Sequence, residues 1–222
     1  MESIIMTIHP KTLLLPTITQ PGKIRKCVCL AVLVFVAGCT AIPTSLGPTA
    51  IPLQYQMVAS PGEFPTLPTC AAISSIQVTD TRLDKTIGKR YVETNPSVTA
   101  PVTASSDVAA WVRSGASATA QRVGINQTAG GAVLRLSVRQ IMTSENVARR
   151  SGYEGRIVLS AELVRKGGGV CWQDHTEGAS ENYGYSGAVD NYQETLNHAL
   201  DRAMIRLLGD PGFQKSICSC GH

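Results

Sequence analysis

The sequence predicts an α+β fold in which two helices pack on one face of an antiparallel sheet, in the order strand, helix, three strands, helix. Two observations indicate this fold. Residues 107–123 and 191–208 place apolar side chains at helical spacing, whereas apolar and polar side chains alternate over much of residues 132–185. Strands joined by short turns form an antiparallel meander, and helices that flank a meander can cover one of its faces.

The first part of the chain, residues 1–38, has the features of a secretory signal peptide with a long N-terminal region. A cationic cluster, Lys23-Ile24-Arg25-Lys26, precedes an uncharged apolar run from Cys27 to Gly38. The 12 residues of this run span about 18 Å as a helix, which is too short for a hydrocarbon core of about 30 Å. We therefore predict that this segment directs export and is removed.

The end of the apolar run, Val36-Ala37-Gly38-Cys39, resembles the lipobox of bacterial lipoproteins. In such proteins a diacylglyceryl group is attached to the Cys thiol, and the chain is cut before that Cys. Because a buried acyl chain contributes about 0.8 kcal/mol per CH₂, covalent lipid on Cys39 would hold the chain at a membrane. No other cofactor is expected. Thr40 follows Cys39, which by resemblance to Gram-negative sorting rules favours the outer membrane.

Residues 39–69 are predicted to be a lipidated Cys followed by a Pro-rich tether. The segment has six prolines and no helical periodicity, which favours an extended chain that lifts a domain off the membrane. The alternative is a segment packed on the domain. Leu53, Tyr55 and Met57 support this alternative because they alternate with glutamines, as in an edge strand.

The α+β domain is predicted to span residues 70–217. In its first strand Ile76 and Val78 share one face, and residues 80–88 are predicted to be a turn. A helix follows, with Asp107 as its N-cap and Gly124 just after its end. Five of its apolar residues lie on one stripe: Val108, Trp111, Val112, Ala116 and Ala120.

The meander comes next, with strands at residues 132–142, 156–164 and 170–185. A polar turn is expected at 143–152 and a Gly-rich hairpin turn at 166–169. The final helix, at about 191–208, carries five apolar residues at helical spacing: Leu196, Ala199, Leu200, Ala203 and Leu207. Residues 218–222 are predicted to be a tail that contains two cysteines.

The first strand also carries a family resemblance. The run Ile76-Gln77-Val78-Thr79-Asp80-Thr81-Arg82, followed by Ile87-Gly88, resembles the opening of the YajG-type bacterial lipoproteins, and the order of elements is similar over about residues 70–217. This resemblance implies a small periplasm-facing domain on an outer-membrane anchor, with no established activity. The Pro-rich tether and the cysteine-bearing tail depart from the family pattern.

Charge excludes one class of partner. The chain has a formal net charge of +4, but four of its 20 basic residues and one of its 16 acidic residues precede Cys39. The remaining chain is therefore nearly neutral. It has no basic stripe for a phosphate backbone, so nucleic acid is not an expected partner. Hydrophobic residues make up 43% of the chain, enough to form a core.

Four cysteines besides Cys39 lie in the predicted mature chain: Cys70, Cys171, Cys218 and Cys220. In an oxidising periplasm an even set indicates two disulfides, for which three connectivities exist. Cys218 and Cys220 are too close in sequence to bond each other readily. We expect each of them to pair with Cys70 or Cys171, which would close the two ends of the domain.

Two other functions for polar residues stay open, a metal site and an acid–base site. Cys218, Cys220 and His222 could hold a soft metal, although a structural zinc site normally has four ligands. His175, between Asp174 and Glu177, could act in acid–base chemistry. No nucleophile is placed beside His175 by the sequence.

The favoured function is therefore a non-enzymatic outer-membrane lipoprotein that faces the periplasm and serves as an accessory or structural partner in the cell envelope. Its expected partners are the membrane, through the lipid anchor, and an envelope protein. The alternative is a periplasmic module that binds a small ligand or a metal through the Cys/His tail.

We expect Asp80 and Arg82 to have a structural role and not to form a functional site. Their period-two spacing places both side chains on one side of the first strand's end. A charge-assisted hydrogen bond between them could fix the following turn.

Overall fold

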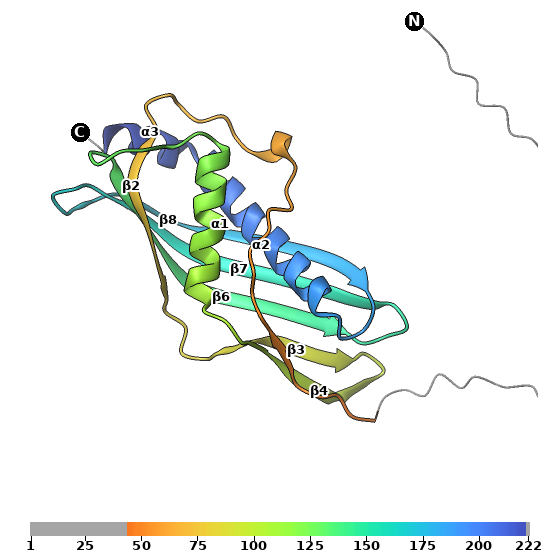
Figure 1. Ribbon diagram of the computed structural model, residues 1–222. Helices are drawn as coiled ribbons and strands as arrows, with labels where there is room; N and C mark the ends of the chain where they lie inside the picture. Colours follow the sequence, from red (N-terminus) through yellow and green to blue (C-terminus); the bar gives the residue numbers. More distant parts are fainter. Residues whose placement is uncertain (1–43, 221–222) are drawn as a thin grey trace, which may run out of the picture. The chain divides into compact units, whose positions relative to one another are not determined.

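Three long antiparallel strands form one side of the sheet in the computed structural model, which describes residues 44–220. They are β6 (Ala132–Asn146), β7 (Ser151–Val164) and β8 (Val170–Gly184), and they confirm the predicted meander (Figure 1). Both β6 and β7 continue into the stretch predicted to be a turn, so only residues 147–150 form the connecting loop.

The sheet is mixed, which corrects the prediction of a purely antiparallel one. Strands β2 (Ala72–Asp80) and β3 (Thr86–Val92) follow one another along the same edge of β6, and both run parallel to it. Between β2 and β6 the chain passes through a hairpin and a helix. Such a long crossover returns the chain in the same direction, which makes the paired strands parallel.

The hairpin of β3 and β4 (Asn95–Ala104) was not predicted. Two short strands also lie outside the predicted order: β1 (Thr49–Ile51), parallel to β4, and β5 (Asn126–Gln127), parallel to β2. A 3₁₀ turn, η1, spans Pro61–Glu63. Prolines obscured β4, because a proline cannot donate a hydrogen bond to the ladder and is tolerated mainly in edge strands.

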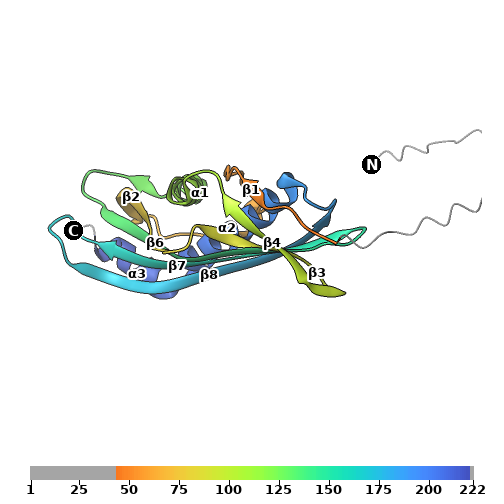
Figure 2. The ribbon, with the colours of Figure 1, turned by 90° about the horizontal axis from the view of Figure 1, so that it is seen from below.

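Helices α1 (Val108–Arg122) and α2 (Val189–Gly209) cover one face of the sheet, as predicted. Helix α1 packs on β2, and α2 packs on β7 and β8; Figure 2 shows α1 to one side of the curved layer of strands. The predicted N-cap is confirmed, since the Asp107 carboxylate accepts from the Ala109 N–H at 2.8 Å.

A third helix, α3 (Pro211–Ser219), corrects the predicted number of two. Asp210 ends α2 and caps α3, because its carboxylate accepts the Phe213 N–H at 2.6 Å. Pro211 at the first position of α3 suits a helix start, where no backbone N–H is needed. This Asp-Pro pair in the sequence is the signal that could have revealed α3.

Close approach of α2 to β8 depends on small residues. A Cβ added at Gly178 would overlap the carbonyl oxygen of Ala199. On either side of this glycine, Thr176 donates to the Ala203 carbonyl at 2.7 Å and Ser180 donates to the Thr195 carbonyl at 2.5 Å. These hydroxyls add to the helical hydrogen bonds and fix the position of α2 along the strand.

Two edges of the sheet are protected against further strand pairing. Arg202 and Arg206 of α2 donate to the carbonyl oxygens of Ala179 and Glu177 on the free edge of β8, at 2.5 and 2.9 Å. Along the other edge, β4 carries Pro96 and Pro101. Charged side chains and prolines are the usual means by which proteins prevent edge-to-edge association.

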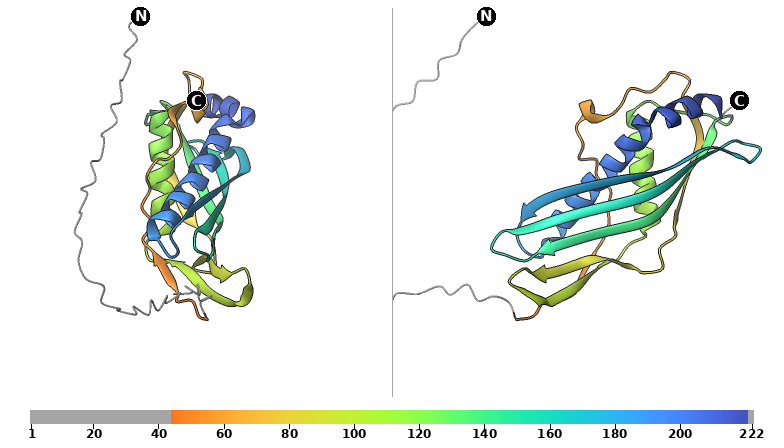
Figure 3. Two further views of the ribbon diagram at one scale, coloured as in Figure 1. Left: turned by 90° about the vertical axis from the view of Figure 1, so that its right-hand side faces the viewer. Right: turned by 180° about the vertical axis from the view of Figure 1, so that it is seen from behind.

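The long strands separate two ends of the domain, seen from behind in the right-hand view of Figure 3. We call the first the Glu145 end; it contains Arg90, Glu145 and the loops 147–150 and 185–188. We call the opposite one the disulfide end; it contains the loop 165–169 and four paired cysteines.

Candidate functional site

A buried carboxylate, that of Glu145, organises the Glu145 end. Alternation along β6 places Ile141, Thr143 and Glu145 on the face that the helices cover, and Glu145 is 0% exposed. Removing an ionised carboxylate from water costs several kcal/mol unless hydrogen bonds and an opposite charge compensate for the lost hydration. The partners of Glu145 therefore decide whether this end is stable.

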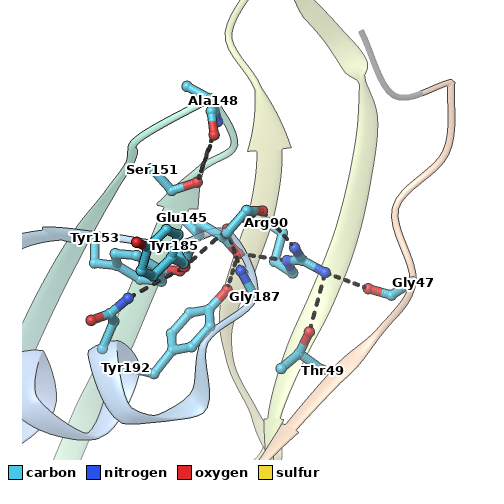
Figure 4. A network of polar contacts seen from close by, with 12 residues as sticks. Gly47, Thr49, Arg90, Glu145, Ala148, Ser151, Tyr153, Tyr185, Gly187 and Tyr192 are labelled. Atoms are coloured by element: carbon cyan, nitrogen blue, oxygen red, sulfur yellow. Dashed lines mark hydrogen bonds and ion pairs between the residues drawn. The ribbon is translucent and has the colours of Figure 1, made fainter. Parts of the chain in front are cut away.

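Four strong donors converge on the two carboxylate oxygens (Figure 4). One oxygen accepts from Arg90 Nε at 2.6 Å and from the Tyr192 hydroxyl at 2.5 Å. The other accepts from the Ser186 hydroxyl and the Gly187 N–H, each at 2.8 Å. Strand β3, helix α2 and the loop 185–188 are thereby tied to the end of β6.

These contacts set the ionisation of the cluster. Burial raises the pKa of Glu145, but hydrogen bonds from Arg90, Tyr192, Ser186 and Gly187 outweigh burial and leave that pKa below its ordinary value. Burial and the neighbouring Glu145 carboxylate raise the pKa of Tyr192. The carboxylate is thus ionised and the phenol protonated at neutral pH. Because its lone pairs are occupied, Glu145 is suited to structural stabilisation rather than to proton transfer.

Arg90 extends the network to the beginning of the described chain. Its Nη1 donates to the Gly47 carbonyl and the Thr49 hydroxyl, each at 3.4 Å, and its Nη2 donates to Ser186 at 3.2 Å. The network was missed from the sequence because Glu145 fell inside the predicted polar turn. Residues 143–146 are all polar, and the register shift between Val138 and Gln140 reverses the face that period-two spacing from Leu134 would give Glu145.

A second cluster attaches the segment 52–59, which we call the strap, to α2. Gln193 and Asn197 donate to strap carbonyl oxygens at 3.0 and 3.2 Å, and Asp201 accepts from the strap. These three residues are spaced by four, so they form one stripe along the helix. Their contacts are mostly with backbone atoms, which makes the strap resemble an extended peptide bound across α2.

The Asp201 carboxylate is 0% exposed and holds the strap with three hydrogen bonds. It accepts from the Tyr55 hydroxyl at 2.6 Å and from the N–H groups of Val58 and Ala59 at 2.8 Å each. Burial and the bond to Asp201 raise the pKa of Tyr55. The segment predicted as a free tether is therefore packed on the domain over the strap, as in the alternative left open by the sequence.

Replacing Asp201 by asparagine should loosen the strap. The amide would direct donor hydrogens at donor groups, which we expect to cost about 2 kcal/mol. Hydrogen exchange of the Val58 and Ala59 amides would accelerate more than exchange in β7. Asp190→Asn, which changes an exposed acid on the same helix, is the matched control and should cost below about 1 kcal/mol. Unchanged exchange at Val58 and Ala59 in Asp201→Asn would contradict this account.

The predicted pairing of the tail cysteines is confirmed. Cys70 is bonded to Cys218 and Cys171 to Cys220, with Cα–Cα distances of 5.2 and 5.9 Å. The bonds join α3 to the segment before β2 and to the start of β8. They therefore fasten the C-terminal helix to both sides of the disulfide end.

The alternative metal site loses its thiolates to these bonds, since both tail sulfurs are in disulfides. His222 and residue 221 lie outside the described residues. Within residues 44–220 no group of three or more His, Cys, Asp or Glu side chains is placed to hold a metal ion.

The Asp174, His175 and Glu177 side chains do not assemble into a catalytic set. Asp174 accepts from the backbone N–H of His175 at 2.7 Å, and Glu177 is paired with Arg156 at 2.7 Å. The His175 ring lies 3.0 Å from the Ser160 hydroxyl on the exposed face of the sheet. Asp174 therefore makes its hydrogen bond to the His175 backbone and not to the imidazole.

Asp80 and Arg82 form the predicted structural pair. The Arg82 Nε and Nη2 atoms donate to the two Asp80 carboxylate oxygens at 2.8 and 2.7 Å. The pair lies at the break between β2 and β3. Hydrogen bonding from Arg82 lowers the pKa of Asp80, so the Asp80 carboxylate is ionised at neutral pH.

The sheet face that the helices leave uncovered is polar and shallowly hollowed. A hollow of about 500 Å³ on this face is lined by residues that include Met142, Glu154, Arg156 and Glu181. Charges of both signs border it, so the local field does not favour one charged class of ligand.

The proposed lipidation residue Cys39, the lipobox residues Val36, Ala37 and Gly38, and the segment 1–38 lie outside the described residues. Among the helices of residues 44–220, none is both long enough and apolar enough to cross a bilayer.

Comparisons with known proteins give a distant fold likeness. No protein-family model matches the chain, and no curated protein matches it. The chain is similar to a solved structure, protein XCC0632 from Xanthomonas campestris, which is described by the family model DUF330. The two share 12% identity, and the likeness covers 75% of this chain and 93% of that chain, with a TM-score of 0.43. A likeness this weak carries no functional argument.

Proposed function

We propose that the protein is an outer-membrane lipoprotein that faces the periplasm and acts as a non-enzymatic accessory or structural partner in the cell envelope. The observation that carries the proposal is Val36-Ala37-Gly38-Cys39 placed directly after a cationic cluster and an apolar run. A lipobox needs small residues before an alkylated Cys, and this segment supplies both in the required position.

The two disulfides support the same location, the periplasm. Disulfides form and persist in oxidising compartments such as the periplasm, and are rare in the cytosol. The two bonds of the disulfide end suit a domain that is exported before it folds. The resemblance of the Asp80 to Arg82 run to YajG-type lipoproteins supports a periplasm-facing domain as well.

An accessory role is supported by how the buried polar groups are used. Glu145 and Asp201 are 0% exposed, and each is occupied by structural donors. The open sheet face is polar and carries charges of both signs. Such a face is suited to contact with another protein through its polar surface.

The anchor is tested with Cys39→Ala, expressed in a Gram-negative host beside the unchanged chain. We expect the unchanged chain to be cut before Cys39, to carry acyl mass and to fractionate with the outer membrane. Cys39→Ala should lose the acyl mass and the cut. Cys29→Ala, in the apolar run, is the control and should behave as the unchanged chain. If Cys39→Ala and the unchanged chain have the same mass and location, the proposal is wrong.

The accessory role is tested by capture inside the cell. A photo-reactive residue at Met142, which is 44% exposed on the open face, should cross-link to one envelope protein. The same residue at Leu83, in the loop after β2, is the control site. Failure to capture any envelope protein at Met142 across several growth conditions would contradict a partner on this face.

A further inference from the structure

Exposed tyrosines and arginines gather at the Glu145 end. Tyr183 and Tyr185 are 59% and 86% exposed, and Arg149 and Arg150 are exposed at the tip of the loop 147–150. The Arg150 guanidinium lies over the Tyr183 ring, 5.7 Å from its centroid. Ion pairs among residues 44–220 do not engage either arginine. This surface therefore offers free cations beside amphipathic rings.

The chain itself ties this end to the proposed lipid anchor. Gly47, which accepts from Arg90, comes eight residues after Cys39. Eight residues reach at most about 28 Å when fully extended. Strand β7 has 14 residues and spans about 45 Å. The anchor is thus joined at the Glu145 end, and the disulfide end lies a strand length away.

We propose that the Glu145 end rests on the phospholipid headgroups of the membrane that holds acylated Cys39, an inference that rests on the proposed function. Tyr183 and Tyr185 lie at the headgroup level, and Arg149 and Arg150 contact lipid phosphates. The long strands then stand away from the membrane, with the disulfide end farthest from it.

The chemistry of these side chains fits headgroups. A tyrosine has an apolar ring and a polar tip, which favours the boundary between acyl chains and water. An arginine binds phosphate oxygens with two parallel hydrogen bonds. Each cation near an anionic leaflet raises partitioning about five-fold, and salt screens the effect. The β3–β4 turn carries one acid, Glu93, whose carboxylate accepts a hydrogen bond from the Asn146 amide at 2.9 Å.

The orientation is tested on the full lipidated chain in vesicles of phosphatidylethanolamine and phosphatidylglycerol that contain a lipid with a nitroxide on its headgroup. Tryptophan probes are Tyr185→Trp at the Glu145 end and Val170→Trp at the disulfide end, where Val170 is 50% exposed. The unchanged chain gives the background from its two native tryptophans. We expect the nitroxide to quench the 185 probe at least two-fold and to leave the 170 probe unchanged.

Charge dependence gives the second readout. Adding Arg149→Gln and Arg150→Gln should at least halve the quenching of the 185 probe in vesicles rich in phosphatidylglycerol, and high salt should mimic this loss. Equal quenching of the two probes, while the chain carries acyl mass and floats with vesicles, overturns the orientation and leaves the proposed function intact. A chain without acyl mass that does not float overturns both. Unchanged quenching in the double arginine variant overturns the role of the arginines.

Discussion

Replacing Glu145 by glutamine is expected to lower the free energy of unfolding by about 3 to 5 kcal/mol, the usual effect of removing one partner of a buried ion pair. Whichever way the amide is placed, its donor hydrogens face donor groups: Arg90 and Tyr192 on one side, or Ser186 and Gly187 on the other. Urea denaturation followed by circular dichroism measures the loss.

The matched control is Glu177→Gln, which removes the acid of another Arg–Glu pair. Arg156 and Glu177 are 45% and 39% exposed, so water and salt screen their attraction. Exposed pairs contribute about 0 to 1 kcal/mol. Similar losses in Glu145→Gln and Glu177→Gln would show that burial of Glu145 does not determine its contribution.

The stability of the domain should also depend on Glu145 at acidic pH. Because the pKa of Glu145 in the folded protein is below its ordinary value, the ionised form stabilises the fold. This stabilisation is present above about pH 4.3, the ordinary glutamate pKa, and it is lost as the pH falls through the lower pKa of the folded state. Glu145→Gln should flatten the dependence of stability on pH in this acidic window. An unchanged slope below pH 4.3 would contradict the assignment.

Removal of the Cys70–Cys218 bond is expected to cause the second large loss of stability. Changing both cysteines to alanine should destabilise the domain by about 2 to 5 kcal/mol, because the unfolded chain gains the freedom that the bond removes. The sequence separation is 148 residues for this bond and 49 for Cys171–Cys220. Loop entropy alone then predicts that the first removal costs about 1 kcal/mol more than the second.

Two double-alanine variants, one without Cys70–Cys218 and one without Cys171–Cys220, are denatured under non-reducing conditions to compare their losses of stability. The unchanged protein in reducing buffer should be less stable than either variant, because it lacks both bonds. If the two variants are equally stable, strain or packing in the folded state outweighs loop entropy. The role assigned to loop length would then be wrong.

Elements with local signals were predictable from the sequence. The alternation in β6 and β7, the Asp107 cap of α1 and the apolar stripe of α2 are properties of neighbouring residues. Each survives into the fold because local preference and tertiary packing agree there. The disulfides were predictable for a similar reason, since four cysteines of which two lie close together in the tail leave few possible pairs.

Elements that depend on distant partners were not predictable in this way. Strand β1 has three residues and exists only because β4 lies beside it. The strap has only the short alternation of Leu53, Tyr55 and Met57, which does not show where the strap binds. It is held by hydrogen bonds between its backbone and side chains of a helix more than a hundred residues later. Parallel pairing of β2 and β3 with β6 also joins distant segments. Such contacts leave little trace in a short stretch of sequence.

The central residue of the candidate site illustrates the same limit. A glutamate in a polar stretch is normally solvent-exposed, and Glu145 is buried only because Arg90, Tyr192 and the loop 185–188 surround it. Its role follows from residues of three other elements. Period-two spacing from Leu134 would place Glu145 on the outer face, because it misses the register shift between Val138 and Gln140, and it could not supply the donors that make the buried position stable.

The Cys70–Cys218 bond has a consequence for proteolysis. Every residue between these cysteines belongs to a covalent ring, so one cut in the loop 147–150 or 165–169 leaves the two fragments joined. For a chain anchored at Cys39, such nicks would release nothing from the membrane. Shedding by a single cut requires cleavage between Cys39 and Cys70, where the bound strap shields part of the substrate. Nicked protein would run as one band on a non-reducing gel and as two bands after reduction.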